Sequence, residues 1–146
     1  MEKGIDYIGI SVSYFVHDGK GNYVMNLRGK NCRDEHGRWD FGGGSVEFGD
    51  TLEETLAKEI KEEYGAEIYR KKFLGHIESF REHDGKKTHW IHFHYLVQVR
   101  PEEVINGEPH KFDEIGWFRL DALPEPLHSA IPECLNRFKE RMLLNT

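Results

Sequence analysis

The chain has 146 residues, a formal net charge of -6 and 38% hydrophobic side chains, which fits one domain, residues 1–146, with a core that needs no disulfide staples. The acidic balance gives no electrostatic footprint for duplex DNA or RNA, and no apolar run is long enough to cross a bilayer. The only cysteines, Cys32 and Cys134, are isolated, so we expect a cytoplasmic protein with neither membrane nor duplex nucleic acid as a partner.

The first predicted element is a β-hairpin. Residues 7–16 are rich in β-branched and aromatic side chains, and a Gly- and Asn-containing turn at 17–22 leads into a strand over 23–28. Arg28 ends that strand, and a polar loop follows it. Since an anionic substrate of an acidic protein must be attracted by local bases, this region is a candidate for substrate binding. The basic candidates are Arg28, Lys30, Arg33 and Arg38.

A glycine-rich loop joined to a helix comes next. Residues 39–41 enter the loop, and the three glycines at 42–44 allow backbone with φ > 0 and close approach to a ligand. A helix with both of its ends marked by capping residues should follow. The capping residues are Asp50 or Thr51 at the start, Glu53 or Glu54 in a capping box, and Gly65 at the end.

Three carboxylates converge on one face of this helix. At about 100° per residue, Glu59, Glu62 and Glu63 fall within roughly a quarter turn. Two such charges 4 Å apart repel by about 4 kcal/mol at an effective dielectric constant of about 20, so a partly buried cluster calls for a cation. Mg²⁺ suits these hard oxygen ligands and usually bridges one or two carboxylates to substrate phosphates.

The alternative is an ordinary solvated helix face. Against it, the predicted core stripe of Leu56, Ile60 and Tyr64, with Ala57 alongside, is bordered by Glu59 and Glu63 on a helical wheel. Pairs of Lys58 with Glu54 and Glu62 would each stabilise the helix by only about 0.2 to 0.5 kcal/mol, which is too little to explain all the acids.

The rest of the chain predicts more strands and a second helix. Strand-like segments run over 67–80 and 88–99 around a polar turn, a short strand covers 115–118, and a helix covers 128–144 after a proline-containing break. With the first helix, this order predicts an α/β fold in which helices pack on a mixed sheet.

Trp90, His92 and His94 alternate onto one face of the strand over 88–99. Hydrogen-bonded structural histidines are the first interpretation, substrate contact the second. A zinc site is the third, since it would need a further ligand such as His76 or His89.

The loop and helix resemble the signature of the Nudix hydrolase (MutT-like) family, G-x5-E-x7-R-E-U-x-E-E-x-G-U with U aliphatic. Asp50 stands where the first Glu is expected, and Lys58 stands where the Arg is expected. Residues 114–118, Glu-Ile-Gly-Trp-Phe, are similar to a further family segment that precedes the last helix. The resemblance implies a Nudix-type α/β/α sandwich with a mixed β-sheet. The matching positions, in order, are Gly44, Glu59, Ile60, Glu62, Glu63, Gly65 and Ala66.

By resemblance, Glu59 and Glu63 are the main Mg²⁺ ligands, with Glu62 as a further or outer ligand and the Gly44 carbonyl as another; Mn²⁺ is the alternative ion. The proton acceptor is Glu62 or Glu63, and Lys58 takes the place of the Arg that orients the catalytic acids. A further acid often completes such sites from outside the helix. The candidates for it are Glu47, Glu108, Asp113 and Glu114.

Substrate contacts are expected at the glycine loop and its flanks. Arg28 resembles the Arg that closes the corresponding strand in many family members, although an ordinary solvated strand-end Arg is equally consistent with the sequence. Trp39 or Trp117 could stack on a nucleobase, whereas aromatic residues in strands more often belong to the core. The predicted substrate-binding residues are Arg28, Trp39, Gly43 and Gly44.

The resemblance implies Mg²⁺-dependent hydrolysis of a nucleoside diphosphate linked to a group X, giving a nucleoside monophosphate and phospho-X. A nucleoside triphosphate or modified nucleotide is the favoured small-molecule substrate, and an ADP-ribose or nucleotide-sugar pyrophosphatase is an alternative. Because Asp50 and Lys58 depart from the signature, a catalytically weak nucleotide-binding regulatory module is a further alternative. A homodimer is compatible with each of these.

Overall fold

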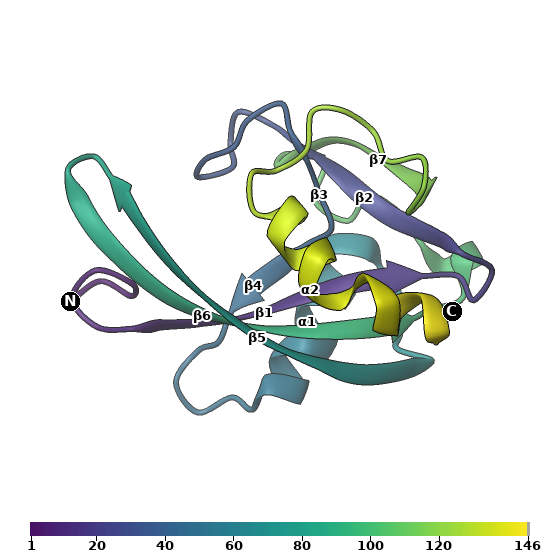
Figure 1. Cartoon of the computed structure of the whole chain (residues 1–146), viewed down its shortest axis with the longest axis horizontal. Coiled ribbons are helices and arrows are strands. Elements are labelled where there is room, and N and C mark those ends of the chain that lie inside the picture. Colours follow the sequence, from purple (N-terminus) through teal and green to yellow (C-terminus); the bar gives the residue numbers. More distant parts are fainter. Residues whose placement is uncertain (146) are drawn as a thin grey trace.

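The computed structural model describes residues 1–145 and shows a mixed sheet with one α-helix on each face (Figure 1). The strand order is β3-β2-β1-β6-β5, with β4 paired to β1 and β7 paired to β2. In chain order the elements are β1 (Gly9–His17), β2 (Asn22–Arg28), β3 (Trp39–Asp40), β4 (Gly43–Ser45), α1 (Leu52–Tyr64), β5 (Arg70–His83), β6 (Lys86–Gln98), the 3-10 helix η1 (Pro101–Glu103), β7 (Phe112–Arg119) and α2 (Ile131–Leu144).

The predicted N-terminal hairpin is present only at its turn. β1 and β2 pair antiparallel at His17 and Tyr23 and then diverge. Along its whole length β1 lies parallel to β6, and it also holds the glycine loop, because Val12 pairs with Gly44 in β4. β2 pairs instead with β3 and β7. The divergence of the two strands leaves room between them for a cavity that opens beside the glycine loop.

β5 and β6 form the predicted second hairpin, with both strands running closer to the turn than the predicted ranges 67–80 and 88–99. Its turn contains Asp84 and Gly85 at φ 50° and 76°, which suits a tight hairpin connection. We call its distal part, residues 78–90, the arm. In Figure 1 the arm extends away from the body beside the N-terminal segment, and His89 N–H donates to the Gly4 carbonyl at 2.8 Å.

The core has two parts because successive residues of β1 point to opposite faces of the sheet. Val12 and Val16 pack with the buried face of α1, whereas Phe15 packs with Phe138 of α2. In Figure 1 α2 lies in front of the sheet and α1 lies behind it. The predicted α/β/α sandwich is therefore confirmed, and among residues 1–145 no helix is long and apolar enough to cross a membrane.

The capping prediction for α1 is confirmed and narrowed to single residues. The Thr51 side chain accepts from Glu54 N–H, the Glu54 side chain accepts from Thr51 N–H, and Gly65 ends the helix in the left-handed conformation at φ 70°. Leu56, Ile60 and Tyr64 are fully buried, as predicted.

Two local predictions about the helices are wrong. Ala57 is exposed, and Thr55 takes the buried place beside the stripe, where its hydroxyl donates to the Thr51 carbonyl at 2.9 Å. α2 begins at Ile131 rather than at 128. His128 N–H donates to the Trp39 carbonyl at 2.8 Å, so residue 128 extends the β3 edge instead of starting the helix.

Candidate functional site

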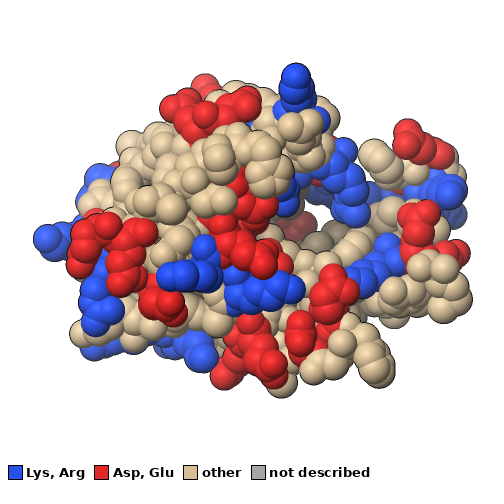
Figure 2. All heavy atoms as spheres, turned by 180° about the vertical axis from the view of Figure 1, so that it is seen from behind, with Lys and Arg blue, Asp and Glu red and all other residues tan. Residues whose placement is uncertain are grey.

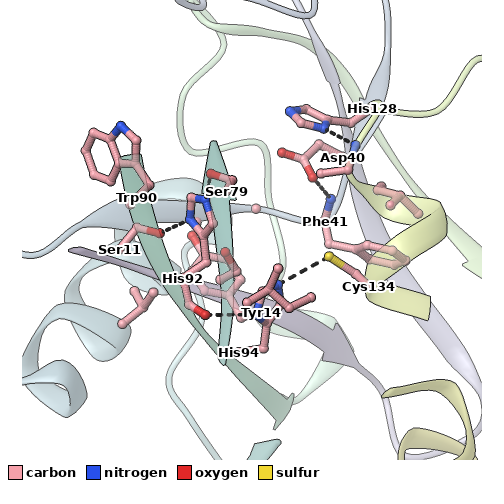
Figure 3. Close-up of a pocket in the computed structure, with 18 of the residues that line it drawn as sticks. Ser11, Tyr14, Asp40, Phe41, Ser79, Trp90, His92, His94, His128 and Cys134 are labelled. Atoms are coloured by element: carbon pink, nitrogen blue, oxygen red, sulfur yellow. Dashed lines mark hydrogen bonds between the residues drawn. The ribbon is translucent and has the colours of Figure 1, made fainter. Parts of the chain in front are cut away.

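A cavity of about 600 Å³ lies between the glycine loop, the diverging strands and the inner face of the arm. Figure 3 shows His92 in its centre, with Ser79 and Trp90 on one side and Asp40 and His128 on the other. Figure 2 shows the molecule from behind, with a hollow between the body and the arm that both basic and acidic side chains border. The volume is in the range of pockets that bind small molecules, about 300 to 1,000 Å³.

Two helix carboxylates lie directly against the glycine loop. A Cβ atom added at Gly44 would be 2.6 Å from Glu59 Oε2, and one added at Gly42 would be 2.7 Å from Glu63 Oε1. Gly42 also has φ 127°, which other residues rarely adopt. The loop therefore needs glycine at these positions, because the carboxylates of α1 lie where a larger side chain would begin.

Burial and crowding act together on these acids. Burial raises the pKa of the Glu63 carboxyl well above its usual value; the Tyr14 hydroxyl, which donates to Glu63 Oε1, opposes that rise, and nearby Glu59 adds to it. Burial and the charge of Glu62 raise the pKa of Glu59, while Lys58 opposes that rise. Neither carboxylate has an ion-pair partner among residues 1–145, and a divalent cation would relieve the repulsion between them.

The structure distinguishes the acids proposed from outside the helix. Gly107 N–H donates to the Glu63 carbonyl at 2.9 Å, which holds the loop after η1 against the end of α1. The next residue, Glu108, has a side chain only 16% exposed, and its charge raises the pKa of both Glu59 and Glu63. Asp113 and Glu114 are exposed on β7 and are not among the main causes of either shift in pKa.

Arg28 lines the cavity, but acids already surround it. Its guanidinium lies 3.1 Å from Asp34 and 3.6 Å from Asp40, and its side chain is 17% exposed. It is therefore more than a solvated strand-end arginine. The ion pairs also hold Asp40 at the cavity, where its charge contributes to raising the pKa of Glu63.

Several predicted site residues lie elsewhere. Lys58 and Glu62 are exposed on α1 and do not line the cavity. Glu47 is exposed and pairs with Lys3 at 2.7 Å. Trp39 is in the core, packed edge-on against Phe118, so the base-stacking prediction for Trp39 is corrected: its indole has no face toward the cavity.

The histidines of β6 are hydrogen-bonded, as the first interpretation predicted. His92 Nδ1 lies 2.5 Å from Ser11 Oγ and Nε2 lies 2.9 Å from Ser79 Oγ, while His94 Nε2 lies 3.3 Å from Cys134 Sγ. Burial lowers the pKa of each imidazole to about 4. Across residues 1–145 no three His, Cys, Asp or Glu side chains are grouped to hold a metal ion, so the zinc interpretation has no support. The helix acids, too, would need oxygen ligands from the substrate.

Sequence reasoning missed three polar residues of the site. Tyr14 and Asp40 lie in strand-like segments and carry no distinguishing local signal. Asn26 is 1% exposed and lines the cavity; its amide donates to the Tyr64 hydroxyl at 2.9 Å, and its Oδ1 has no partner among the described residues. The only sequence signal for Asn26 as a site residue was its polar amide within an apolar strand, since such a group is costly to bury.

Comparison with known proteins gives the same family as the signature. A family model described as the NUDIX domain matches residues 8–138. The nucleoside triphosphatase NudI of Klebsiella pneumoniae is 34% identical over 116 residues, which cover 71% of this chain and 77% of that protein. The NAD-capped RNA hydrolase NudC of Pseudomonas aeruginosa is 27% identical over 122 residues, 81% of this chain and 39% of that protein.

Solved structures show the same architecture over nearly the whole chain. A MutT NUDIX hydrolase from Burkholderia pseudomallei has a TM-score of 0.79 and 26% identity, covering 90% of this chain and 98% of that one. The MutT protein from Methanosarcina mazei has a TM-score of 0.76 and 26% identity, with 92% and 94% covered. The chain spans 29% to 53% of the length of five of the curated relatives it matches.

Proposed function

The chain belongs to the Nudix family, and from this we propose that it is a pyrophosphohydrolase. It cleaves a nucleoside diphosphate linked to a group X into a nucleoside monophosphate and phospho-X. The observation that carries the proposal is the placement of Glu59 and Glu63 against the glycines of the loop. Glu63 and these glycines line a nucleotide-sized cavity, whereas Glu59 does not line it. Acidic side chains without a matching cation, next to backbone that a phosphate chain can approach, form half of a metal–phosphate site.

The Nudix family generally uses divalent metal ions such as Mg²⁺, and the donor set fits one. Glu59, Glu63 and the Gly44 carbonyl would hold the ion, with Glu62 at the outer edge, and all are hard oxygen donors. Burial first, and neighbouring acids second, raise the pKa of the Glu59 and Glu63 carboxyls. When bound, Mg²⁺, or Mn²⁺ in its place, supplies charge neutralisation and lowers the pKa of water.

The protein's own groups position the reactants and accept the proton. Tyr14 donates to Glu63 and so orients a carboxylate that has no solvent shell to hold it. Lys58 favours the ionised form of Glu59. A carboxylate takes the proton from the attacking water, and the candidates are Glu62, Glu63 and the newly located Glu108; such general-base assistance contributes roughly 10²- to 10⁴-fold.

The favoured substrate is a nucleoside triphosphate or modified nucleotide, and the similarity to NudI, a nucleoside triphosphatase, supports this choice. The similarity to NudC, whose name specifies NAD-capped RNA, supports cleavage of a dinucleotide or other nucleotide conjugate as the alternative. In either case the phosphate chain contacts the backbone of Gly43 and Gly44 and the side chain of Arg28, which all line the cavity.

A substrate panel tests the proposal. Triphosphates, nucleotide sugars, ADP-ribose and dinucleotides are incubated with Mg²⁺, with and without chelator, in ¹⁸O-labelled water, so that the labelled product identifies the phosphorus that was attacked. E59Q and E63Q should each lose most activity and require more Mg²⁺. E53Q is the matched control, because Glu53 lies on the same helix and forms only an exposed ion pair with Lys71.

Two results would count against this function. Full turnover in both E59Q and E63Q would remove the carboxylates from the mechanism. Thermal stabilisation by nucleotide and Mg²⁺, with no product after long incubation, would identify the nucleotide-binding module that the departures at Asp50 and Lys58 suggest.

A further inference from the structure

The cations that line the cavity fall into two pairs. Arg28 and Lys111 each lie within 4 Å of a carboxylate, at 3.1 Å from Asp34 and 3.7 Å from Glu108. Arg33 and Arg81 also line the cavity, yet within residues 1–145 neither has a carboxylate at ion-pair distance. The cavity therefore has two guanidinium groups with no carboxylate at ion-pair distance, although the charge of Arg81 helps to lower the pKa of Glu35.

Both arginines are neighbours of Trp90, one over its ring and the other along the hairpin. The Arg33 guanidinium is 5.8 Å above the Trp90 ring centroid. On the arm, Trp90 pairs with Ser79 and Thr88 pairs with Arg81, so all four side chains lie on one face of the hairpin and Arg81 is a diagonal neighbour of Trp90. Figure 3 shows that face, with Trp90 and Ser79 bordering the cavity.

Hydrogen bonds bring three chain segments together around Arg33 and Arg81, which we call the arm end of the cavity. Arg81 Nη2 donates to Ser129 Oγ at 3.1 Å, and Ser129 N–H donates to Glu35 Oε1 at 2.6 Å, two residues after Arg33. These bonds connect the arm, the loop after β2 and the segment before α2. Each arginine retains N–H donors for a ligand, because a guanidinium has five.

The acids nearest to this end are engaged or lie at its edge. Glu78 pairs with His89 at 2.9 Å, Glu35 accepts from Ser129, and Asp34 pairs with Arg28. Glu133, in the first turn of α2, is exposed at the cavity wall. An anion between the two arginines would therefore lie near carboxylates of the arm and the loop that already have hydrogen-bond or ion-pair partners.

This end is separate from the helix carboxylates but belongs to the same cavity. Asp40 influences both ends, since its charge contributes to raising the pKa of Glu63 and opposes the lowering of the pKa of His92. Arg81 and Arg33 act on His92 in the opposite sense. The cavity thus runs from Glu63, past Asp40 and His92, to the two arginines.

We propose that Arg33 and Arg81 bind an anionic group, a phosphate or a carboxylate, on the part of the substrate remote from the phosphoanhydride that is cut. This inference rests on the proposed function and narrows it. The substrates it selects are nucleotides or nucleotide conjugates with a second negative centre, separated from the scissile diphosphate by the length of the cavity. Paired guanidiniums suit phosphate and carboxylate because they bind these groups through parallel N–H···O bonds.

Anion binding is measured first, without turnover. Inorganic phosphate is titrated into the metal-free protein labelled with ¹⁵N-arginine while the Nε–H resonances are followed. We expect saturable shifts of the Arg33 and Arg81 signals, and phosphate binding weakened roughly 10-fold in R33Q and in R81Q.

Two arginines outside the cavity provide matched controls. Arg100 also lies over a ring, 5.0 Å from the Tyr69 centroid, and Arg137 makes one hydrogen bond, to the His76 carbonyl at 3.3 Å. R100Q and R137Q should bind phosphate like the parent protein. Unshifted Arg33 and Arg81 signals, or equal losses in the control variants, would overturn the proposal.

Kinetics then relate the site to turnover. NADPH and NADH form a matched pair that differs by one phosphate remote from the pyrophosphate. We expect NADPH to have the lower KM, and R33Q and R81Q to raise that KM with kcat unchanged, since the contact is the same in the ground and transition states.

The two proposals can fail separately. Hydrolysis that is unaffected by R33Q and R81Q, with no shift of their signals in phosphate, would refute the anion site and leave the hydrolase function intact. Phosphate binding at both arginines without hydrolysis of any nucleotide would establish the anion site and refute the hydrolase.

Discussion

Replacement of Gly44 by alanine tests the contact between the loop and α1, the helix that we propose to be catalytic. The added Cβ would lie 2.6 Å from both Cγ and Oε2 of Glu59. Ordinary contact begins at about 3.4 Å, so the carboxylate must retreat by about 1 Å. The Gly44 backbone itself needs no left-handed conformation, since its φ is outside the positive range. The substitution therefore acts on the position of Glu59.

The expected effect on activity is large and the effect on stability is small. Displacement of a catalytic group by about 1 Å can cost roughly 100-fold in rate. Because Glu59 is half-buried and its side chain can rotate toward solvent, the free energy of unfolding should change by less than about 1 kcal/mol. The G44A variant should also require a higher Mg²⁺ concentration for half-maximal rate.

A double-mutant cycle provides the assay. Initial rates are measured against Mg²⁺ concentration for G44A, E59Q and the G44A/E59Q double variant, and urea unfolding is measured for each. If the alanine acts through Glu59, its effect should largely vanish in the E59Q background. Full activity in G44A, or an undiminished effect of G44A when residue 59 is glutamine, would refute the reasoning.

Three further predictions concern the supporting structure. Y14F removes the hydroxyl that donates to buried Glu63 and should lower the free energy of unfolding in urea by about 1 to 3 kcal/mol. It should also move the acidic limb of the pH–activity profile to higher pH, because the lost hydrogen bond held the pKa of Glu63 down. An unmoved limb would contradict this role. His92 and His94 have a pKa of about 4 in the folded state, below the ordinary 6.5 of a histidine, so the unfolded chain binds more protons and stability should fall as pH drops from about 6.5 toward 4, by at most roughly 1.4 kcal/mol per pH unit for each. A flat urea midpoint across that range would show that they titrate normally. G107A places a Cβ against a backbone carbonyl of α1, which cannot rotate away. Unlike G44A, it should therefore lower the melting temperature by several degrees in calorimetry. An unchanged melting temperature would mean that the loop after η1 can shift freely.

Local features of the chain were predictable because nearby residues determine them. Thr51, Glu54 and Gly65 define the ends of α1 through bonds that span only three or four residues. The i, i+4 spacing is a property of any helix, so the placement of Glu59 and Glu63 on one side of α1 followed from the sequence, whereas Glu62 is exposed. The hydrogen-bonded state of His92 and His94 was also anticipated from alternation along a strand.

The arrangement of distant segments could not be predicted in the same way. β1 and β2 are consecutive and joined by a tight turn, yet they separate because β1 pairs with β4 and β6 and β2 pairs with β3 and β7. That separation forms the cavity. Trp39 shows the same limit, since an aromatic residue beside a glycine loop suits either a core or a ligand, and its packing against Phe118 decided the matter.

The sequence by itself determined the helix α1, its caps, its acids and the family signature that they form, because each of these depends on residues a few positions apart. Only the tertiary structure brought Glu108 near enough to Glu59 and Glu63 for its charge to raise the pKa of both, and brought Arg33 and Arg81 to one cavity. The physical reason is that these choices depend on strand register and loop docking between segments dozens of residues apart, where many pairings satisfy the same local pattern.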